Sequence, residues 1–277
     1  MADEHPALNG VARTALLVAA IRARESTRPD RLFEDPYADV LAGQIGRDFL
    51  EAALATSGEQ STVQIVVRTR FWDEALLRAT RSVRQVVVIA AEMDARAFRL
   101  DWPAGTTVFE LDQPEVISAK ADLLADAAPR CRRVTLGVDL AADWSDALPA
   151  AGFDAHAPAV WLMEGLLQYL HETQVRALFK RIDALSAPGS VLLYEVIGTA
   201  LLESPFMVPV LESMAAQGSP WLFGTDDPGE LAGRHGWTAS VTDIAEPGNA
   251  WRRWFTPAVP LDVPNVPRGY FIEAVKP

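Results

Sequence analysis

The chain has 277 residues, 49% of them hydrophobic and 22% charged, a balance typical of folded globular domains. Its formal net charge of −12 argues against a nucleic-acid partner, because the phosphates of DNA and RNA repel acidic proteins. The longest apolar runs are far shorter than the roughly 18 residues that span a bilayer. A single cysteine and four scattered histidines exclude a disulfide framework and a Cys/His metal cluster.

These properties predict a protein that acts on a small molecule and has neither a nucleic-acid nor a membrane partner. The lone Cys131 fits a reducing compartment, so we expect a cytoplasmic location. No metal site is expected. Both a monomer and a dimer remain open.

The first 80 residues have the character of a helical N-terminal cap. Apolar residues recur at helical spacing from about Val11 to Ala23 and again from about Val63 to Thr80. Between these stretches, Ser26–Ala38 contains two prolines and several turn-forming residues, which predicts an irregular linker.

From Gln85 onward the pattern changes to short β-branched runs that alternate with helical segments. This alternation predicts a doubly wound α/β sheet of seven strands, Rossmann-like, over residues 81–277. The run Val86–Ile89 is apolar at every position, so we expect a central strand that is buried on both faces. A helical insert is expected at about 199–220, and the last strand, near 269–275, is expected to form a hairpin.

Several acidic residues follow predicted strands, at the sheet edge where ligands bind in open α/β folds. Asp112 ends the second strand, 22 residues after Ala90, a spacing at which a carboxylate accepts hydrogen bonds from ribose hydroxyls. The same segment, Asp-Gln-Pro-Glu, also resembles the start of a helix, where Asp is a common cap. Both roles stay open.

Several motifs, taken together, resemble the leucine carboxyl methyltransferase-like family of class I S-adenosylmethionine-dependent O-methyltransferases, which is abundant in actinobacteria and includes polyketide carboxyl methyltransferases. The resemblance runs from about residue 11 to residue 275. The motifs that carry it are ARTALLVAAIRARESTRPDRLFEDPYA, VVRTRFWDEAL, VVVIAAEMDARAFRLDWPAGTTVFELDQPEV, WLMEGLLQYL, FGTDDPGELAGRHGW and VPRGYFIEAVK.

The resemblance implies that S-adenosylmethionine is the cofactor and names the residues that contact it. Arg68 would pair with the cofactor carboxylate, with Arg70 as its competitor. Asp139 and Leu140 would flank the adenine, and Glu164 would lie near the methionine moiety. Glu164 could instead form a structural ion pair with Arg68 or Arg96. The full implied set is Arg68, Ala90, Glu92, Asp94, Asp112, Gln113, Asp139, Leu140 and Glu164.

The loop after the first strand departs from the family pattern G-A-G-x-D-[ST]-R. Ala90 and Glu92 replace both glycines, which in such loops let a ligand touch the backbone. The Glu92 carboxylate could repel the carboxylate of the cofactor, pair with its ammonium or sulfonium, or turn outward and leave the cofactor slightly displaced. We expect repulsion, so that a Glu92→Gly variant binds the cofactor more tightly.

The expected reaction is methyl transfer to a carboxylate or an acidic hydroxyl of a hydrophobic small molecule, such as a secondary metabolite. A carboxylate is ionised at neutral pH and needs no general base, so no catalytic residue is named. The alternative is a protein of the same fold that catalyses another reaction or only binds, as the changed loop would allow. Expected substrate walls, which could also be ordinary core, are Thr14, Arg22, Phe33, Tyr37, Tyr169, Phe206, Met207, Met214 and Trp221.

Overall fold

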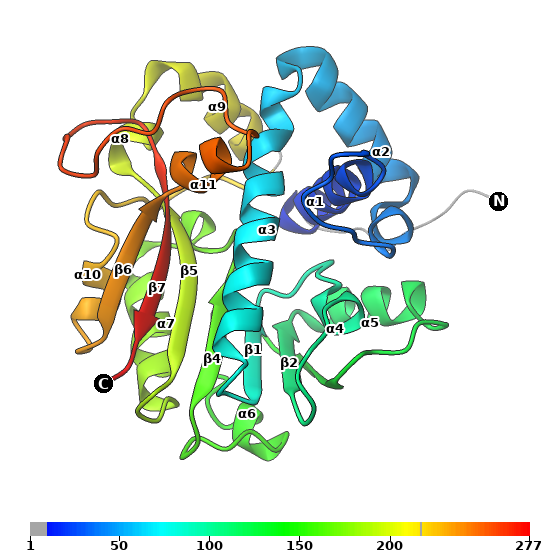
Figure 1. Cartoon of the computed structure of the whole chain (residues 1–277), viewed down its shortest axis with the longest axis vertical. Helices are drawn as coiled ribbons and strands as arrows, with labels where there is room; N and C mark the ends of the chain where they lie inside the picture. The colour runs from blue at the N-terminus through cyan, green and yellow to red at the C-terminus, as the bar shows by residue number, and fades with distance from the viewer. Residues whose placement is uncertain (1–9, 217) are drawn as a thin grey trace.

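A seven-stranded sheet runs through the middle of the computed structural model, which describes residues 10–216 and 218–277 (Figure 1). Its strand order is β3-β2-β1-β4-β5-β7-β6, and only β7 runs antiparallel to its neighbours. The predicted α/β sheet and its antiparallel last strand are therefore confirmed. The strands are β1 (Gln85–Ile89), β2 (Thr107–Asp112), β3 (Arg132–Gly137), β4 (Ala159–Met163), β5 (Val191–Ile197), β6 (Thr238–Asp243) and β7 (Gly269–Val275).

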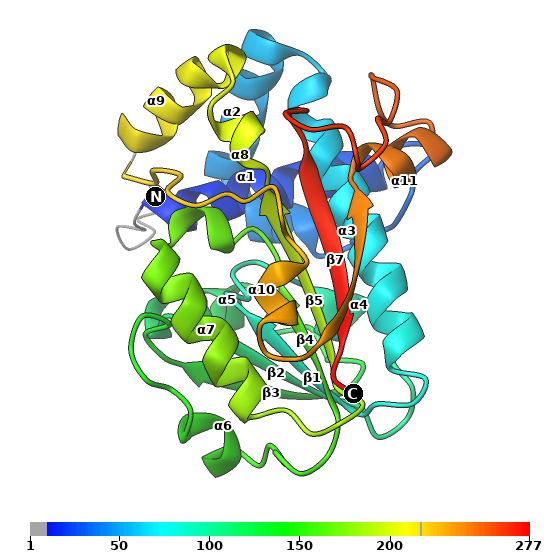
Figure 2. The ribbon, with the colours of Figure 1, turned by 90° about the vertical axis from the view of Figure 1, so that its left-hand side faces the viewer.

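Helices cover both faces of this sheet, with α3 and α11 on one side and α6, α7 and α10 on the other (Figure 2). Within the described residues, no helix has the length and apolar character that crossing a membrane requires. The helices are α1 (Gly10–Ser26), α2 (Ala38–Ser57), α3 (Gln60–Ala79), α4 (Arg96–Arg99), α5 (Pro114–Leu123), α6 (Ala147–Ala150), the 3₁₀ helix η1 (Leu167–Tyr169), α7 (Glu172–Ala184), α8 (Thr199–Leu202), the 3₁₀ helix η2 (Pro205–Met207), α9 (Val208–Ala216), α10 (Glu230–Gly233) and α11 (Ala245–Ala250).

Strand β1 lies at the centre of the sheet and is buried on both faces, as its apolar run predicts. Val86 and Val88 pack into the core cluster that also contains residues of α1, α2 and α3. Val87 and Ile89 point the other way, into the cluster shared with α6, α7 and α10. Successive side chains of a strand face opposite sides, so both faces need apolar residues. The N-terminal helices thus share one continuous core with the sheet.

Helix α2 has no counterpart in the sequence-based prediction, which left residues 38–57 unassigned. The helix is interrupted at Gly43, whose φ of 56° and ψ of −168° are not helical, so the apolar periodicity is broken there. Gly46 faces α1, and a Cβ at this position would lie 2.5 Å from the carbonyl oxygen of Leu16. Close packing of the two helices therefore depends on a glycine, a residue that lowers helix propensity.

The loop after β1 is held by backbone contacts and by one buried lysine. The Ala91 N–H donates to the Leu111 carbonyl of β2 at 3.1 Å, and the Asp94 N–H donates to the Ala91 carbonyl at 2.8 Å. Lys120 of α5 is fully buried and donates to the carbonyls of Ala91 at 3.2 Å and Asp94 at 3.1 Å. Its ammonium also pairs with Glu110 at 2.7 Å. Lys120 therefore joins the loop, β2 and α5.

Two residues of this loop adopt positive φ angles without being glycine. Ala90 has a φ of 57° and Glu92 a φ of 33°, in the region where a Cβ is strained. These are the positions at which the family pattern has glycine, so the backbone retains a glycine-type conformation after both glycines are lost.

We expect Lys120→Met to destabilise the protein by about 3 kcal/mol, because it leaves Glu110 buried with one cation fewer. Arg133 still pairs with Glu110 at 2.8 Å and limits the loss. Urea denaturation measures the effect. Lys180→Met, on an exposed position of α7, is the matched control and should change stability little. An equally small effect at Lys120 would contradict the bracing role.

We expect Ala90→Gly to stabilise the protein by about 1 kcal/mol, because it removes the strain of a Cβ at positive φ. Ala91→Gly, at the neighbouring buried position without positive φ, should destabilise it instead. Chemical denaturation of both variants gives the two signs. Destabilisation by both glycines would show that Ala90 is not strained.

Candidate cofactor-binding site

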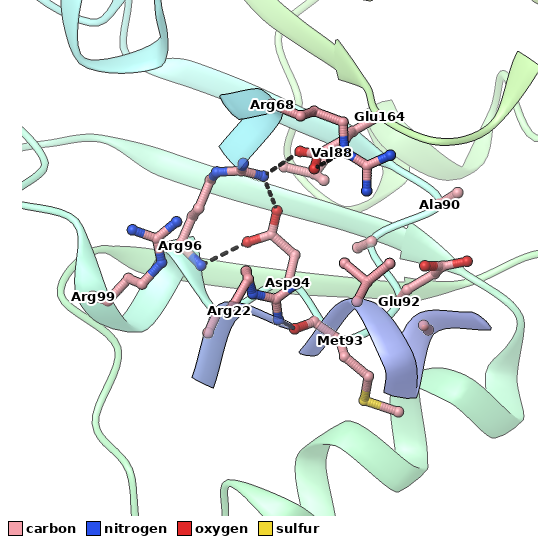
Figure 3. Close-up of a pocket in the computed structure, with 14 residues that line it drawn as sticks. Arg22, Arg68, Val88, Ala90, Glu92, Met93, Asp94, Arg96, Arg99 and Glu164 are labelled. Carbon is pink, nitrogen blue, oxygen red and sulfur yellow. Dashed lines mark hydrogen bonds and ion pairs between the residues drawn. The ribbon is translucent and has the colours of Figure 1, made fainter. Parts of the chain in front are cut away.

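A cavity opens at the carboxyl end of β1, between the loop that follows this strand and helices α1 and α3 (Figure 3). The volume that the centre of a water molecule can reach inside it is about 30 Å³. The lining residues are Ala15, Val18, Arg22, Arg68, Val88, Ala90, Ala91, Glu92, Met93, Asp94, Ala95, Arg96, Arg99 and Glu164. This is the sheet edge at which the sequence predicts a ligand.

Arg96 lies buried at the wall of the cavity with three carboxylates around its guanidinium. Its nitrogens lie 2.5 Å from Asp94, 2.7 Å from Glu164 and 2.7 Å from Asp73 of α3 (Figure 3 shows the first two). Burial alone would raise the pKa of Asp94, but Arg96 and Lys120 outweigh it and hold this pKa at about 2. Asp94 is therefore ionised across the physiological pH range.

Arg68 of α3 also lines the cavity, and two carboxylates already occupy its guanidinium. Its Nε lies 2.8 Å from Glu164, and a terminal nitrogen donates to Glu195 of β5 at 2.8 Å. Glu164 thus forms ion pairs with both Arg68 and Arg96, the two structural partners that the sequence analysis left open. Arg70 points elsewhere, pairing with Glu74 at 2.5 Å, and does not line the cavity.

The other two arginines of the cavity wall are paired as well. Arg22 of α1 donates to Asp35 at 2.9 Å and to the Met93 carbonyl at 2.5 Å. Arg99 contacts Asp73 at 2.7 Å. The four guanidiniums of the wall are therefore neutralised by protein carboxylates. Over residues 10–216 and 218–277, no group of acidic, histidine or cysteine side chains is placed to hold a metal ion.

Asp112, at the end of β2, organises the backbone at the edge of the cavity. One carboxylate oxygen accepts the N–H of Glu92 at 2.7 Å, and the other accepts the N–H of Gln113 at 2.7 Å. The cap residue of α5 is Gln113, with Pro114 in the first turn. Each Asp112 oxygen still has lone-pair capacity, so this bonding leaves room for a further donor.

The carboxylate of Glu92 is partly buried and points away from the ion pairs around Arg96 (Figure 3). It accepts no hydrogen bond and forms no ion pair with any residue that the structure describes. Burial raises its pKa to about 8, and the negative charges of Asp112 and Glu164 add to this more than Arg68 takes away. The cavity is therefore lined, at the loop after β1, by a partly buried carboxyl without a partner.

Three of the expected substrate-wall residues come together near this carboxyl. The Tyr169 hydroxyl of η1 interacts with the side chains of Thr14 and Trp221, which lower its pKa. Burial is the larger effect and raises this pKa overall, and the charge of Glu92 raises it further. The Trp221 indole N–H is buried and meets the geometric criteria for a hydrogen bond with none of the described residues. Residues from α1, η1 and the segment after α9 thus meet at one place.

The remaining predicted contacts lie outside the cavity lining. Asp139 is exposed after β3 and accepts the N–H of Ala141 at 2.9 Å, and the neighbouring Leu140 is partly buried. Gln113 is exposed. All three lie at strand ends on the β2–β3 side of the sheet.

Phe33 and Tyr37 take part in core packing beside α4. The Phe33 ring lies 5.7 Å from the Arg99 guanidinium, and the Tyr37 ring lies 5.7 Å from that of Phe98. Phe206 and Met207 belong to η2 in the insert, where Phe206 is 64% exposed.

The sequence reasoning missed two acids that fix the site, Asp73 and Glu195. Both are buried among apolar neighbours, and each pairs with an arginine of the cavity wall. A charged residue inside an otherwise apolar strand, as in LLYEVI, is the signal that could have identified Glu195. Its partner, 127 positions earlier, could not be read from the pattern.

Comparison with known sequences identifies the family. A sequence model of leucine carboxyl methyltransferase matches residues 15–183. A Parafrankia protein is 39% identical over 278 residues, which cover 96% of this chain and 87% of that protein. A Streptomyces coelicolor protein is 43% identical over 252 residues, covering 84% and 83%. Both are named as S-adenosyl-L-methionine-dependent methyltransferases, with no acceptor in either name.

Solved structures support the fold. A methyltransferase-named protein of Thermobifida fusca aligns over 91% of this chain and 96% of its own, with a TM-score of 0.59 and 17% identity. A protein of Streptomyces avermitilis, described as a DUF574 family member, aligns over 92% and 99% with a TM-score of 0.58 and 15% identity. At such identities the likeness concerns the fold alone. The sequence matches confirm the resemblance that the motifs carry, and the chain therefore belongs to the leucine carboxyl methyltransferase family of S-adenosyl-L-methionine-dependent methyltransferases.

Proposed function

We propose that the protein transfers a methyl group from S-adenosylmethionine to a carboxylate or an acidic hydroxyl of a hydrophobic small molecule, in the manner of enzymes of secondary metabolism. The observation that carries this proposal is a cavity at the carboxyl end of β1 whose arginines are paired with carboxylates, together with exposed apolar side chains on the segment between β5 and β6. The family membership supplies the reaction class, and the residues around the cavity limit the chemistry of the acceptor.

The chemistry of the cavity suits this cofactor. When bound, S-adenosylmethionine supplies a methyl group on a positively charged sulfonium. Asp112 would accept hydrogen bonds from the ribose, since its oxygens retain acceptor capacity. Asp139 and Leu140 would hold the adenine. The unpartnered carboxyl of Glu92 suits a cation rather than an anion, so we propose pairing with a cation of the cofactor in place of the repulsion expected from the sequence.

Arg68 is less available for the cofactor carboxylate than the resemblance implies. Its guanidinium is already shared between Glu164 and Glu195. A ligand carboxylate would have to use donor positions that these acids leave, or replace one of them. We therefore propose that Arg68 mainly positions Glu164 and the cavity wall, and that its field only assists in binding the cofactor.

The segment between β5 and β6 offers an apolar surface for an acceptor. Phe206, Val208, Val210 and Leu222 are large apolar side chains with 40% or more of their surface exposed. Helices α8 and α9 lie at the end of the molecule where α1 crosses the sheet (Figure 2). Trp221 of the same segment interacts with Tyr169, which the charge of Glu92 also reaches. Exposed apolar patches are typical of sites for hydrophobic ligands.

The protonation state of the acceptor follows from the side chains present. His171 is the cap residue of α7, and its backbone N–H donates to Gln174 at 2.8 Å. A carboxylate acceptor needs no base because it is ionised at neutral pH. What the residues around the cavity then supply is orientation and the exclusion of water.

The proposal is tested by incubating the protein with methyl-labelled S-adenosylmethionine and a panel of aromatic acids, polyketide-like acids and phenols. We expect labelled methyl esters or ethers from apolar members of the panel, and none from small polar acids. Binding of the cofactor without transfer to any member would argue for a binding protein or for another reaction. Transfer to polar acids alone would overturn the apolar acceptor site.

We expect Asp112→Ala to weaken the binding of S-adenosylmethionine and S-adenosylhomocysteine alike, by roughly 1.5–3 kcal/mol, because both carry the same ribose. Isothermal titration calorimetry measures both affinities. Asp122→Ala, on the exposed side of α5, is the matched control. Unchanged affinities in a folded Asp112→Ala protein would restrict Asp112 to organising the loop.

A further inference from the structure

We propose that Glu92 makes the cavity select the charged cofactor over its demethylated product. S-adenosylmethionine carries a sulfonium charge, which S-adenosylhomocysteine loses when the methyl group leaves. A carboxylate that forms no ion pair with a protein cation would hold the first more tightly than the second. This inference rests on the proposed use of S-adenosylmethionine and adds a specificity-determining residue at a position where the family pattern has glycine.

Protein carboxylates pair with every arginine of the cavity wall. Arg22, Arg68, Arg96 and Arg99 are each within 3.0 Å of a protein carboxylate. These guanidiniums are occupied, and none of the four forms an ion pair with Glu92, although Arg68 and Arg22 act on it at longer range. A cation of a bound ligand would therefore add the direct partner that Glu92 lacks.

The charged groups that surround Glu92 make its ionised form unfavourable unless a cation binds beside it. Asp112 from the end of β2 and Glu164 from the end of β4 both act on it with negative charge. Arg68 from α3 and Arg22 from α1 act with positive charge, and the Tyr169 phenol from η1 is neutral at physiological pH. The carboxylates and burial outweigh the two arginines, so the free protein favours the protonated form of Glu92.

The backbone fixes the point and the direction in which the Glu92 side chain leaves the loop. The Glu92 N–H donates to Asp112 at 2.7 Å, and its positive φ sets the direction in which the side chain leaves the loop. Asp112 is also the proposed ribose ligand. The backbone of Glu92 is thus tied, through one hydrogen bond, to the residue that would position the sugar next to the sulfonium.

The pH dependence follows from the raised pKa of about 8 in the free protein. A cationic ligand favours the ionised form, so binding of S-adenosylmethionine below this pH must release a proton from Glu92. The preference for the charged cofactor should therefore increase as the pH rises toward about 8 and level off above it. S-adenosylhomocysteine lacks the sulfonium and should release fewer protons.

Isothermal titration calorimetry tests this inference with both ligands, in buffers of different ionisation enthalpy, on the parent protein and on Glu92→Gln. Gln keeps the shape of the side chain and removes its charge. Glu51→Gln, an exposed acid of α2, controls for the change in net charge. Comparing the parent protein with Glu92→Gln at each pH cancels the titration of the ligands' own amino groups.

We expect Glu92→Gln to lower the ratio of S-adenosylmethionine to S-adenosylhomocysteine affinity by about tenfold at about pH 8.5, and by less at about pH 6.5. Proton release on binding S-adenosylmethionine near pH 7 should be lost in this variant and kept in Glu51→Gln.

An unchanged affinity ratio, or a ratio that rises in Glu92→Gln, would overturn the inference and support repulsion between Glu92 and the cofactor carboxylate. Failure of both ligands to bind the parent protein would instead overturn the proposed function. The two failures are thus distinguishable in one set of titrations.

Discussion

The three ion pairs of Arg96 are the constraint on which the rest of the site depends. They join α3, through Asp73, to the loop after β1, through Asp94, and to the end of β4, through Glu164. Glu164 extends the network to Arg68, which reaches β5. Buried charges that lose a partner are costly, so these elements can move only together. The cavity wall is therefore built by the fold itself and does not wait for a ligand to shape it.

The loop after β1 shows how a glycine motif can be replaced without losing its backbone path. Ala90 and Glu92 remain at positive φ because the surrounding bonds, from Asp112 and Lys120 among others, determine the course of the chain. Local strain of this kind persists where the neighbourhood over-determines the backbone, and it often accompanies function. The replacement of glycine by Glu92 puts a titratable side chain where the family pattern has none.

The sheet could be predicted from the sequence because β-branched runs such as Val86–Ile89 have few alternatives to a buried strand. The acids at strand ends, Asp112 and Glu164, could be placed at one edge because parallel strands finish on the same side. Helix α2 could not be predicted, since Gly43 breaks its periodicity. The pairing of Arg68 with Glu195 could not be predicted either, because contacts between distant segments depend on packing that no local pattern records.

The position of β7 has a consequence for how the chain reaches this structure. β7 follows β6 in the sequence but lies between β5 and β6 in the sheet. β6 therefore has no place in the sheet until β7 has paired with β5, and assembly at this edge cannot follow the order of synthesis. Pairings across such separations close slowly, because the loop entropy is lost before the contacts form. During that interval the unpaired edge of β5 is exposed, and it is there that a folding intermediate of this protein would be most open to aggregation.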